Sequence, residues 1–355
     1  MKKRFLITVL RFHGDVLLAK PIIDNIKLNY PDSIIDLLVY KGTEAILKHD
    51  MQISNIITLS STSKTNSTSY VKGFKALQSF FTDILLWIRI AFTNYNFGIF
   101  LTTQWRVLPI SWAMVRATKV AVSDKKRRGP LWANSFNTLL PETDDTHIVE
   151  RNLSSLKQLG LKIFSSELKL LNSISEAKKN KCLNVLQEWQ IKDKYCVIHA
   201  TSRRESKLWK IDNYQPLIEA LQKRGLKVVL VSGPEKEEIE YINSIEKNST
   251  NEIINLSGKT SLLTLAFLVS KSSLFIGLDS VASHIAASVN TPSITLFGPS
   301  NASNWKPWST SSLIITRKEE ELCKEHGHLG GKFARCLCYI TPERVVGLVD
   351  RILEN

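Results

Sequence analysis

Short apolar runs alternate with segments of helical spacing along most of the chain. Residues 4–10 and 34–39 are apolar runs typical of buried strands. Between them, residues 16–28 repeat apolar side chains at helical spacing, and Pro31 ends that pattern. The same alternation resumes at residues 195–199. Strands that alternate with helices predict parallel sheets in doubly wound α/β units.

The two series of alternating elements predict two Rossmann-like domains. We expect the boundary near residues 172–190, with domains over 1–175 and 176–340 and a final amphipathic helix within 341–355. Further strands are expected at 99–103, 119–123, 227–231, 253–256, 274–278 and 293–297, and further helices at 107–117, 213–223, 236–247, 262–269 and 281–288. The Ser/Thr/Asn tract at 60–69 indicates a loop.

Composition narrows the class of protein. Of the 355 residues, 43% are apolar and 23% are charged, which excludes a disordered, collagen-like or coiled-coil chain. The unusual feature is a net charge of +14, from 47 Lys and Arg against 33 Asp and Glu. Such a surplus indicates an anionic partner: a nucleic acid, an acidic membrane surface or a phosphorylated substrate.

Neither a membrane span nor a leader segment is expected. The apolar run at 80–92 is short and carries Asp83 and Arg89. Residues 1–10 lack the cleavage site of a signal peptide and are expected to form the first strand. Five cysteines do not suggest a disulfide framework. We therefore expect a cytoplasmic protein that can rest on a membrane.

The loop after the first strand holds Gly14 and Asp15. Ligands of open α/β sheets bind at the carboxyl ends of the strands, so this loop is a candidate site. Asp15 is either an N-cap of the following helix or a general base. The chain contains neither GxGxxG here nor a Walker-type GxxxxGK[ST] motif, which removes the main signals of dinucleotide and P-loop binding.

Two loops in the second series suit a phosphate ligand. One loop runs from His199 through Thr201 and Ser202 to Lys207. Its hydroxyls can donate hydrogen bonds to a phosphate and its lysine supplies a positive charge. The alternative is that the loop is simply a solvated basic segment. The other begins at Asp279 and opens a helix, whose N-terminus favours an anion. In that helix Ser280 and His284 share a face. The same residues would be found if Asp279 were only a helix cap and His284 only a core histidine.

These segments, in this order, resemble the ADP-heptose:lipopolysaccharide heptosyltransferases, a family of GT-B glycosyltransferases, and most of all their third type, which adds a side-branch heptose to the inner core. The matching pieces are Gly14-Asp15-Val16-Leu17-Leu18, His199-Ala200-Thr201-Ser202, Gly233-Pro234-Glu235, Asp279-Ser280 with His284-Ile285-Ala286-Ala287, and Leu296-Phe297-Gly298-Pro299-Ser300 with Trp305 and Pro307-Trp308.

The resemblance implies two Rossmann-like domains facing across a cleft, the first binding the acceptor and the second binding an ADP-sugar. It implies an inverting transfer of heptose from ADP-L-glycero-D-manno-heptose to the inner core of lipopolysaccharide. Asp15 matches the general base and Lys207 the group that stabilises departing ADP. The implied donor ligands are Thr201, Ser202 and Lys207 for the diphosphate, Glu235 or Glu238 for the ribose, Thr260 for the adenine, Asp279 for the heptose, and Ser280, Val281 and His284 for phosphate and sugar.

On the acceptor side, the resemblance implies Gly14, Arg128 and His147. The run at 125–128 could equally be a solvated loop, and His147 could simply orient its helix. In GT-B proteins the final helix, here within 341–355, often packs back on the first domain.

We expect no required metal or other cofactor, because Lys207 and the helix start at Ser280 can stabilise the leaving diphosphate. Cys323, His326, His328, Cys336 and Cys338 have the composition of a metal cluster, but their spacing is not a standard zinc pattern. The expected protein is a monomer at the cytoplasmic face of the inner membrane of a Gram-negative bacterium. The basic surplus would hold it on anionic lipid and on a phosphorylated acceptor.

Three alternatives remain open at this point. A family member could use another acceptor, as the first and second types do, or another nucleotide sugar. A basic nucleic-acid-binding protein would explain the charge, although no motif of that class is present and we expect no nucleic acid partner. A non-catalytic ADP-binding module is the third, which the presence of both Asp15 and Lys207 disfavours.

Overall fold

The chain folds into two compact units, each of which is described by itself. The computed structural model describes residues 2–60, 82–124, 129–141, 145–191, 193–202, 207–298, 300–316, 337 and 339–354. Unit 1 comprises Met1–Ser166 and unit 2 comprises Glu167–Asn355.

The boundary lies earlier than the expected one after residue 175. Residues just after Ser166 already pack in unit 2: the Leu170 amide donates to the Ser288 carbonyl at 3.3 Å. Ile174 joins a buried cluster with Cys182, Leu263 and Phe267. These long-range contacts, which the sequence pattern does not show, assign this segment to unit 2.

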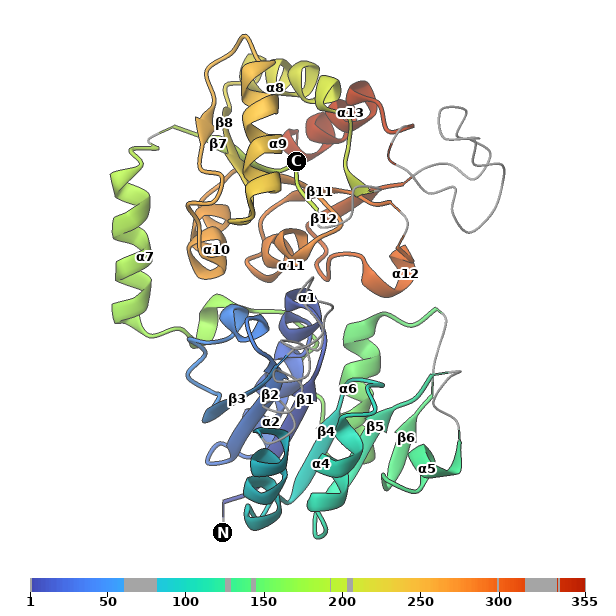
Figure 1. Cartoon of the computed structure of the whole chain (residues 1–355). Helices are drawn as coiled ribbons and strands as arrows, with labels where there is room; N and C mark the ends of the chain where they lie inside the picture. The colour runs from blue at the N-terminus through green and yellow to red at the C-terminus, as the bar shows by residue number, and fades with distance from the viewer. Residues whose placement is uncertain are drawn as a thin grey trace, which may run out of the picture. The chain divides into compact units, whose positions relative to one another are not determined.

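Unit 1 is built on a six-stranded parallel sheet in the order β3-β2-β1-β4-β5-β6 (Figure 1). Its strands are β1 (Arg4–Val9), β2 (Ile34–Tyr40), β3 (Asn55–Leu59), β4 (Phe97–Phe100), β5 (Thr118–Val122) and β6 (Thr138–Leu140). Its helices are α1 (His13–Leu17), α2 (Lys20–Asn29), the 3-10 turn η1 (Thr43–Ile46), α4 (Val107–Ala113), α5 (Pro130–Ala133) and α6 (Ile148–Gln158), and residues 82–92 are also helical.

Unit 2 repeats this design with the order β12-β11-β10-β7-β8-β9. Its strands are β7 (Tyr195–His199), β8 (Lys227–Val231), β9 (Ile254–Asn255), β10 (Leu274–Leu278), β11 (Ser293–Leu296) and β12 (Ser312–Ile315). Its helices are η2 (Leu171–Ser173), α7 (Glu176–Glu188), η4 (Ile211–Asn213), α8 (Tyr214–Lys223), α9 (Lys236–Lys247), α10 (Leu262–Ser270), α11 (Val281–Ser288), α12 (Ala302–Trp305) and α13 (Pro342–Leu353).

Both sheets therefore have the Rossmann order, and this confirms the predicted fold class of paired α/β domains. In each sheet the first strand pairs with the second on one side and the fourth on the other, as β1 does with β2 and β4, and β7 with β8 and β10. The strand order reverses between these neighbours, so the loops at their carboxyl ends diverge and leave room for a ligand.

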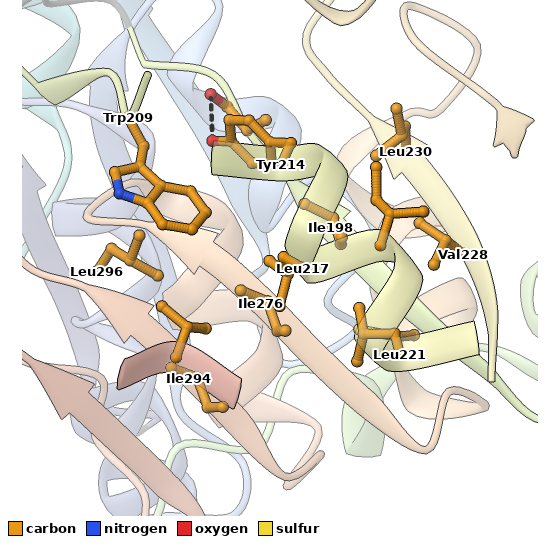
Figure 2. Close-up of a cluster of buried hydrophobic side chains, with 14 of the residues drawn as sticks. Ile198, Trp209, Tyr214, Leu217, Leu221, Val228, Leu230, Ile276, Ile294 and Leu296 are labelled. Atoms are coloured by element: carbon orange, nitrogen blue, oxygen red, sulfur yellow. Dashed lines mark hydrogen bonds between the residues drawn. The ribbon is translucent and has the colours of Figure 1, made fainter. Parts of the chain in front are cut away.

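The core of unit 2 shows how the sequence pattern makes these sheets (Figure 2). β7, β10 and β11 are buried along their whole lengths, as expected for parallel strands covered on both faces. Ile198, Ile276 and Ile294 come from these neighbouring strands and join one buried cluster with Leu217 and Leu221 of α8. The apolar runs read from the sequence are thus the sheet interior.

Trp209 ties the loop between β7 and α8 to this core. Its indole Nε1 donates to the Ile340 carbonyl at 2.6 Å, and its ring lies edge-on to Tyr214 with 5.0 Å between centroids. The Tyr214 hydroxyl in turn donates to the Ala200 carbonyl at 3.5 Å (dashed in Figure 2). Buried aromatic anchors therefore fix both ends of the loop that carries Lys207.

The final helix, α13, packs within unit 2, which corrects its expected assignment to the first domain. Val345 and Val349 enter the core that α8 also covers. Arg224 holds the helix from outside through paired contacts to Asp350, Nε to Oδ1 at 2.5 Å and Nη2 to Oδ2 at 2.8 Å. The apolar face that the sequence predicts is satisfied by this core.

None of the helices in the described parts of the chain has the length and apolar character needed to cross a membrane.

Candidate active site

Lys207 lies at the centre of a polar cluster at the carboxyl edge of the unit 2 sheet. Its Nζ is 2.5 Å from Asp279 Oδ2 and donates to Ser300 Oγ at 2.9 Å. The three residues follow β7, β10 and β11, so the ammonium joins three neighbouring strand ends at the point where the strand order reverses. About a tenth of each side chain of the Lys207–Asp279 pair is exposed, so a ligand can reach both groups.

The start of α11 adds hydrogen-bond donors to this edge. Ser280 is the N-cap residue, but its side chain makes no capping hydrogen bond. Its hydroxyl oxygen is buried and has no hydrogen-bond partner among the described residues. Amides at a helix start point outward with a positive dipole, which favours an anion there. Lys207 and the α11 start thus supply positive potential at one sheet edge.

Glu238 of α9 holds the neighbouring part of this edge together. Its Oε2 accepts from Thr201 Oγ1 at 2.7 Å and from the Gly233 amide at 2.9 Å. A Cβ at position 233 would stand 2.9 Å from the same oxygen, so glycine is what lets the carboxylate approach the backbone. The Thr201 hydroxyl hydrogen is therefore committed to Glu238, and its oxygen lone pairs remain as acceptors.

His199 ends β7 and is buried beside this carboxylate. Burial lowers the pKa of His199 below its ordinary value, and the Glu238 charge partly opposes that shift. The neutral imidazole is therefore favoured, and the positive charge of this edge comes from Lys207.

The remaining predicted donor residues lie in loops and helices that follow the strands of unit 2. Glu235 is exposed at the N-cap of α9, and Thr260 is half-buried in the loop between β9 and α10. Val281 begins α11, and His284 is buried one turn later in that helix. Ser202 is half-buried directly after Thr201. The structure thus brings Lys207, Asp279 and Ser280 to one edge and ties Thr201 to Glu238.

Asp15 occupies the corresponding loop of unit 1, within α1 and next to Gly14. Its Oδ1 lies 2.7 Å from Arg11 Nε, and its Oδ2 accepts from the Phe12 amide at 3.3 Å. The side chain is only 12% exposed. Burial raises the pKa of the Asp15 carboxyl above its ordinary value, while the charges of Arg11 and Arg151 oppose the shift. A raised pKa makes the carboxylate a stronger base.

The structure corrects one of the two readings of Asp15 made from the sequence, because Phe12 and not Asp15 is the N-cap residue of α1. The carboxylate accepts from the amide of the N-cap residue Phe12, so it does stabilise the helix start. This bond and the Arg11 contact leave other lone pairs of the two oxygens available for a proton. Stabilisation of the helix start and base function are therefore compatible in the same side chain.

Helix α6 brings a second arginine toward Asp15. His147 is the N-cap of α6, where its Nδ1 accepts from the Val149 amide at 3.2 Å. One turn later the Asn152 amide nitrogen donates to the Leu18 carbonyl, at 3.4 Å, so α6 lies against the end of α1. The structure gives His147 its helix-orienting role; its role toward an acceptor stays a prediction.

Several partners were not predicted from the sequence. Arg11, Arg151 and Ser300 act on Asp15 or Lys207, and only Arg11 had a sequence signal, four residues before Asp15 on the same turn. Arg128, with the whole run at 125–128, lies outside the described residues, as do Cys323, His326, His328, Cys336 and Cys338. In the described part of the chain, no group of three or more His, Cys, Asp or Glu side chains could hold a metal ion.

Two Rossmann-type sheets, each with polar side chains at its carboxyl edge, have the architecture of the GT-B class. The family model "Glycosyltransferase family 9 (heptosyltransferase)" matches residues 85–331. This chain belongs to glycosyltransferase family 9. The family makes it a glycosyltransferase, in agreement with the resemblance and against the nucleic-acid-binding and non-catalytic alternatives.

Individual relatives agree with this family. The chain is 36% identical over 347 residues to lipopolysaccharide heptosyltransferase 3 of Escherichia coli K12, covering 98% of this chain and 97% of that protein. It is 32% identical over 305 residues to another Escherichia coli protein of that name, covering 86% of each.

Solved structures share the fold at low sequence identity. A family 9 glycosyltransferase from Veillonella parvula superposes with a TM-score of 0.78 at 19% identity, covering 99% of this chain and 98% of that one. The Escherichia coli heptosyltransferase WaaC with ADP gives 0.74 at 18% identity, covering 98% and 99%. These likenesses confirm the GT-B fold.

Proposed function

We propose that this protein transfers heptose from ADP-L-glycero-D-manno-heptose to the inner core of lipopolysaccharide, as a heptosyltransferase of the third type, with inversion at the anomeric carbon. The relatives named lipopolysaccharide heptosyltransferase 3, similar over almost the whole chain, support the substrate and the acceptor. The single structural observation that carries the proposal is Lys207, held by Asp279 and Ser300 where the strand order of unit 2 reverses.

On the donor side, the reaction needs a group that stabilises the negative charge that develops on ADP as it leaves. Lys207 and the amides of the α11 start supply positive potential without a metal, and the Ser280 hydroxyl is available to a phosphate oxygen. Asp279 holds Lys207 in place and offers carboxylate oxygens to the heptose hydroxyls. Thr201, Ser202, Val281 and His284 complete the diphosphate and sugar ligands in this proposal, and Glu235 and Thr260 hold the adenosine.

On the acceptor side, Asp15 takes the proton of the attacking sugar hydroxyl. The hydroxyl oxygen forms the new bond to the anomeric carbon while the bond to the ADP oxygen breaks on the opposite face, which inverts the configuration. The charges of Arg11 and Arg151 favour the ionised carboxylate and so oppose the rise in its pKa that burial causes. Gly14, Arg128 and His147 are the proposed acceptor residues.

The proposal extends to the setting of the enzyme. A soluble monomer at the cytoplasmic face of the inner membrane of a Gram-negative bacterium would meet both a cytoplasmic nucleotide sugar and a lipid-linked acceptor. Its net charge of +14 suits anionic lipid and a phosphorylated core.

The test is the Asp15→Asn variant with ADP-heptose and a truncated core acceptor, followed by mass and linkage analysis. Loss of the base should lower transfer ~10²–10⁴-fold while ADP binding, measured by calorimetry, persists. Full activity of Asp15→Asn would show that the base assignment is wrong.

The competing donors and acceptors of the family need a separate comparison. UDP-sugars and GDP-sugars offered to the same enzyme should give no product, and a core that already carries the side-branch heptose should not accept another. Transfer from a different nucleotide sugar, or to the acceptor of the first or second type, would replace this proposal with that alternative.

A further inference from the structure

Unit 1 differs from unit 2 in the net charge of its sequence and in the apolar exposure of its described residues. Residues 1–166 carry 22 Lys and Arg against 12 Asp and Glu, so ten of the fourteen surplus charges belong to unit 1. Of twelve strongly exposed large apolar side chains in the described parts of the chain, eleven lie in unit 1 and one, Leu353, in unit 2.

Many of these apolar side chains come from one stretch of sequence. Helix 82–92 buries Leu86 and Ile90 in the core of unit 1, as an amphipathic helix should. Its outer face is nevertheless apolar as well: Leu85 is 67% exposed, Ile88 49% and Phe92 86%. These three are spaced by three and four residues and so share one face of the helix. In the part of the chain that the structure describes, this second apolar face of the helix is left exposed.

The neighbouring helix α4 extends this outer face. It packs on the same core as helix 82–92, through Leu108 and Ile110. The Arg106 guanidinium donates to both Asp83 carboxylate oxygens, at 2.8 and 2.7 Å, and so fixes the start of α4 to helix 82–92. At the other end of α4, Trp112 is 51% exposed and Val115 83%.

The short helix α5 continues it on the other side of α4. The Trp112 indole Nε1 donates to Ser135 Oγ at 2.9 Å, directly after α5. The half-exposed Trp105 lies edge-on to Trp132 of α5, with 5.8 Å between centroids. Leu131, next to Trp132, is 57% exposed. The outer faces of helix 82–92, α4 and α5 thus form what we call the 85–131 surface.

Charge distinguishes this surface from an ordinary apolar patch. From residue 84 to residue 123 the chain contains Arg89, Arg106, Arg116 and Lys119 but neither Asp nor Glu. Arg89 and Arg116 are exposed among the apolar side chains. A partner that contacts it must therefore be apolar inside and negatively charged at its boundary.

We propose that the 85–131 surface docks this protein on an anionic lipid bilayer. Leu85, Ile88 and Phe92 enter the acyl boundary, while the half-exposed tryptophans lie at headgroup level, where their rings are favoured. Arg89 and Arg116 contact the anionic headgroups. This inference adds the membrane-facing surface of the protein to the proposed function. It rests on the proposed function only in assuming that the acceptor is linked to a lipid.

The experiment is sedimentation of the full-length protein with sucrose-loaded vesicles, in the absence of donor and acceptor. Binding is expected to vesicles of phosphatidylglycerol and phosphatidylcholine, and to fall when salt is raised, because salt screens exposed charges. Phosphatidylcholine vesicles alone should bind at least about tenfold more weakly. Equal binding to both kinds of vesicle, or none to either, would overturn the proposal.

Two pairs of variants locate the surface. Phe92→Ser and Arg116→Glu should each weaken binding by about tenfold, through lost apolar burial and reversed charge. Leu353→Ser and Lys247→Glu make the same chemical changes at exposed positions of unit 2 and should leave binding within about twofold. If the unit 2 variants lose as much as their partners, net charge alone acts and the surface assignment is wrong.

The remaining readouts separate this inference from its competitors. Sedimentation equilibrium of the wild type should show a monomer, whereas a dimer broken by Phe92→Ser would make a second copy the occupant and overturn the proposal. Transfer to a water-soluble core oligosaccharide should be unchanged in Phe92→Ser and Arg116→Glu. If the wild type transfers heptose but does not bind vesicles, this inference is wrong and the proposed function stands. If it binds vesicles but does not transfer heptose, the proposed function is wrong and this inference stands.

Discussion

The two units share a strand order but use their lysine–carboxylate groups differently. In unit 1, Lys20 at the start of α2 is completely buried: it pairs with Asp24, lies 3.1 Å from the equally buried Asp50 and donates to Gln52 at 3.0 Å. In unit 2, Lys207 makes a similar pair with Asp279 but stays partly exposed at the sheet edge. The first lysine cannot reach a ligand, and the second can.

The difference shows why the fold alone does not locate chemistry. A buried ion pair with matched partners joins segments of the chain, here α2 to the residues that follow η1. A partly exposed pair at a strand end can still present its charged groups to a substrate. Substitutions that remove one lysine at a time therefore separate an effect on stability from an effect on activity.

Lys20→Met should destabilise unit 1 by about 3–5 kcal/mol, because it leaves the buried Asp50 carboxylate without a counter-charge. Urea unfolding followed by circular dichroism measures the change. The exposed Lys247→Met on α9 is the control and should cost less than about 0.5 kcal/mol. A loss as small as the control's would mean that Lys20 is not a structural cation.

Lys207→Met should have the opposite effect, with a large loss of activity and a small change in stability. We expect kcat/KM to fall ~10²–10³-fold, because charge on the departing ADP loses its partner, while stability changes little since the lysine is partly exposed. Steady-state kinetics and ADP calorimetry give the two numbers. The neighbouring, exposed Lys210→Met is the matched control, and unchanged ADP affinity in Lys207→Met would contradict the donor-site assignment.

Substitution of Glu238 should affect both stability and donor binding, whereas substitution of Glu235, at the start of the same helix, should affect donor binding alone. Glu238→Ala leaves Thr201 and the Gly233 amide without their acceptor, so both the stability and the KM for donor should suffer, by about 1–3 kcal/mol in unfolding. Glu235→Ala removes only an exposed side chain, so KM should rise with no change in the urea midpoint. An unaltered KM in Glu235→Ala would exclude its contact with the ribose.

Arg11→Ala tests the charge balance around Asp15. Burial raises the pKa of this carboxyl and Arg11 lowers it, so removing Arg11 should raise the pKa further. Because the base must be ionised, activity is lost as pH falls through this pKa, and the acid limb of the rate profile should move to higher pH. The plateau at high pH stays in place.

The control for Arg11→Ala is Lys41→Ala. Lys41 is an exposed cation of unit 1, and it is not among the described contacts of Asp15. Its profile should match the wild type. An acid limb that stays unshifted in Arg11→Ala would mean that another group controls ionisation of the base.

Much of the fold was predictable because parallel strands buried on both faces leave continuous apolar runs in the sequence. The runs at β1, β7 and β10 are found within a residue or two of the expected positions. The wrong assignment concerned α13, whose apolar face is equally visible in the sequence. Periodicity shows that a face must be covered, but it does not say which core covers it.

For the candidate site, sequence supplied the residues at strand ends and structure supplied their partners. Lys207 and Asp279 lie 72 residues apart, and only the pairing of β7 with β10 brings their loops together. The same holds for Glu238, which faces Thr201 because α9 follows the strand next to β7. Nothing local in the chain signals these contacts.

The sequence by itself determined the α/β class, the strand-end loops with Asp15, Lys207 and Asp279, and a basic surplus. These follow from local periodicity and composition, which are properties of neighbouring residues. The tertiary structure decided which lysine is buried and which is accessible, where the last helix packs, and that the described exposed apolar side chains gather in unit 1. Those properties depend on burial, and burial is set by contacts between segments far apart in the chain.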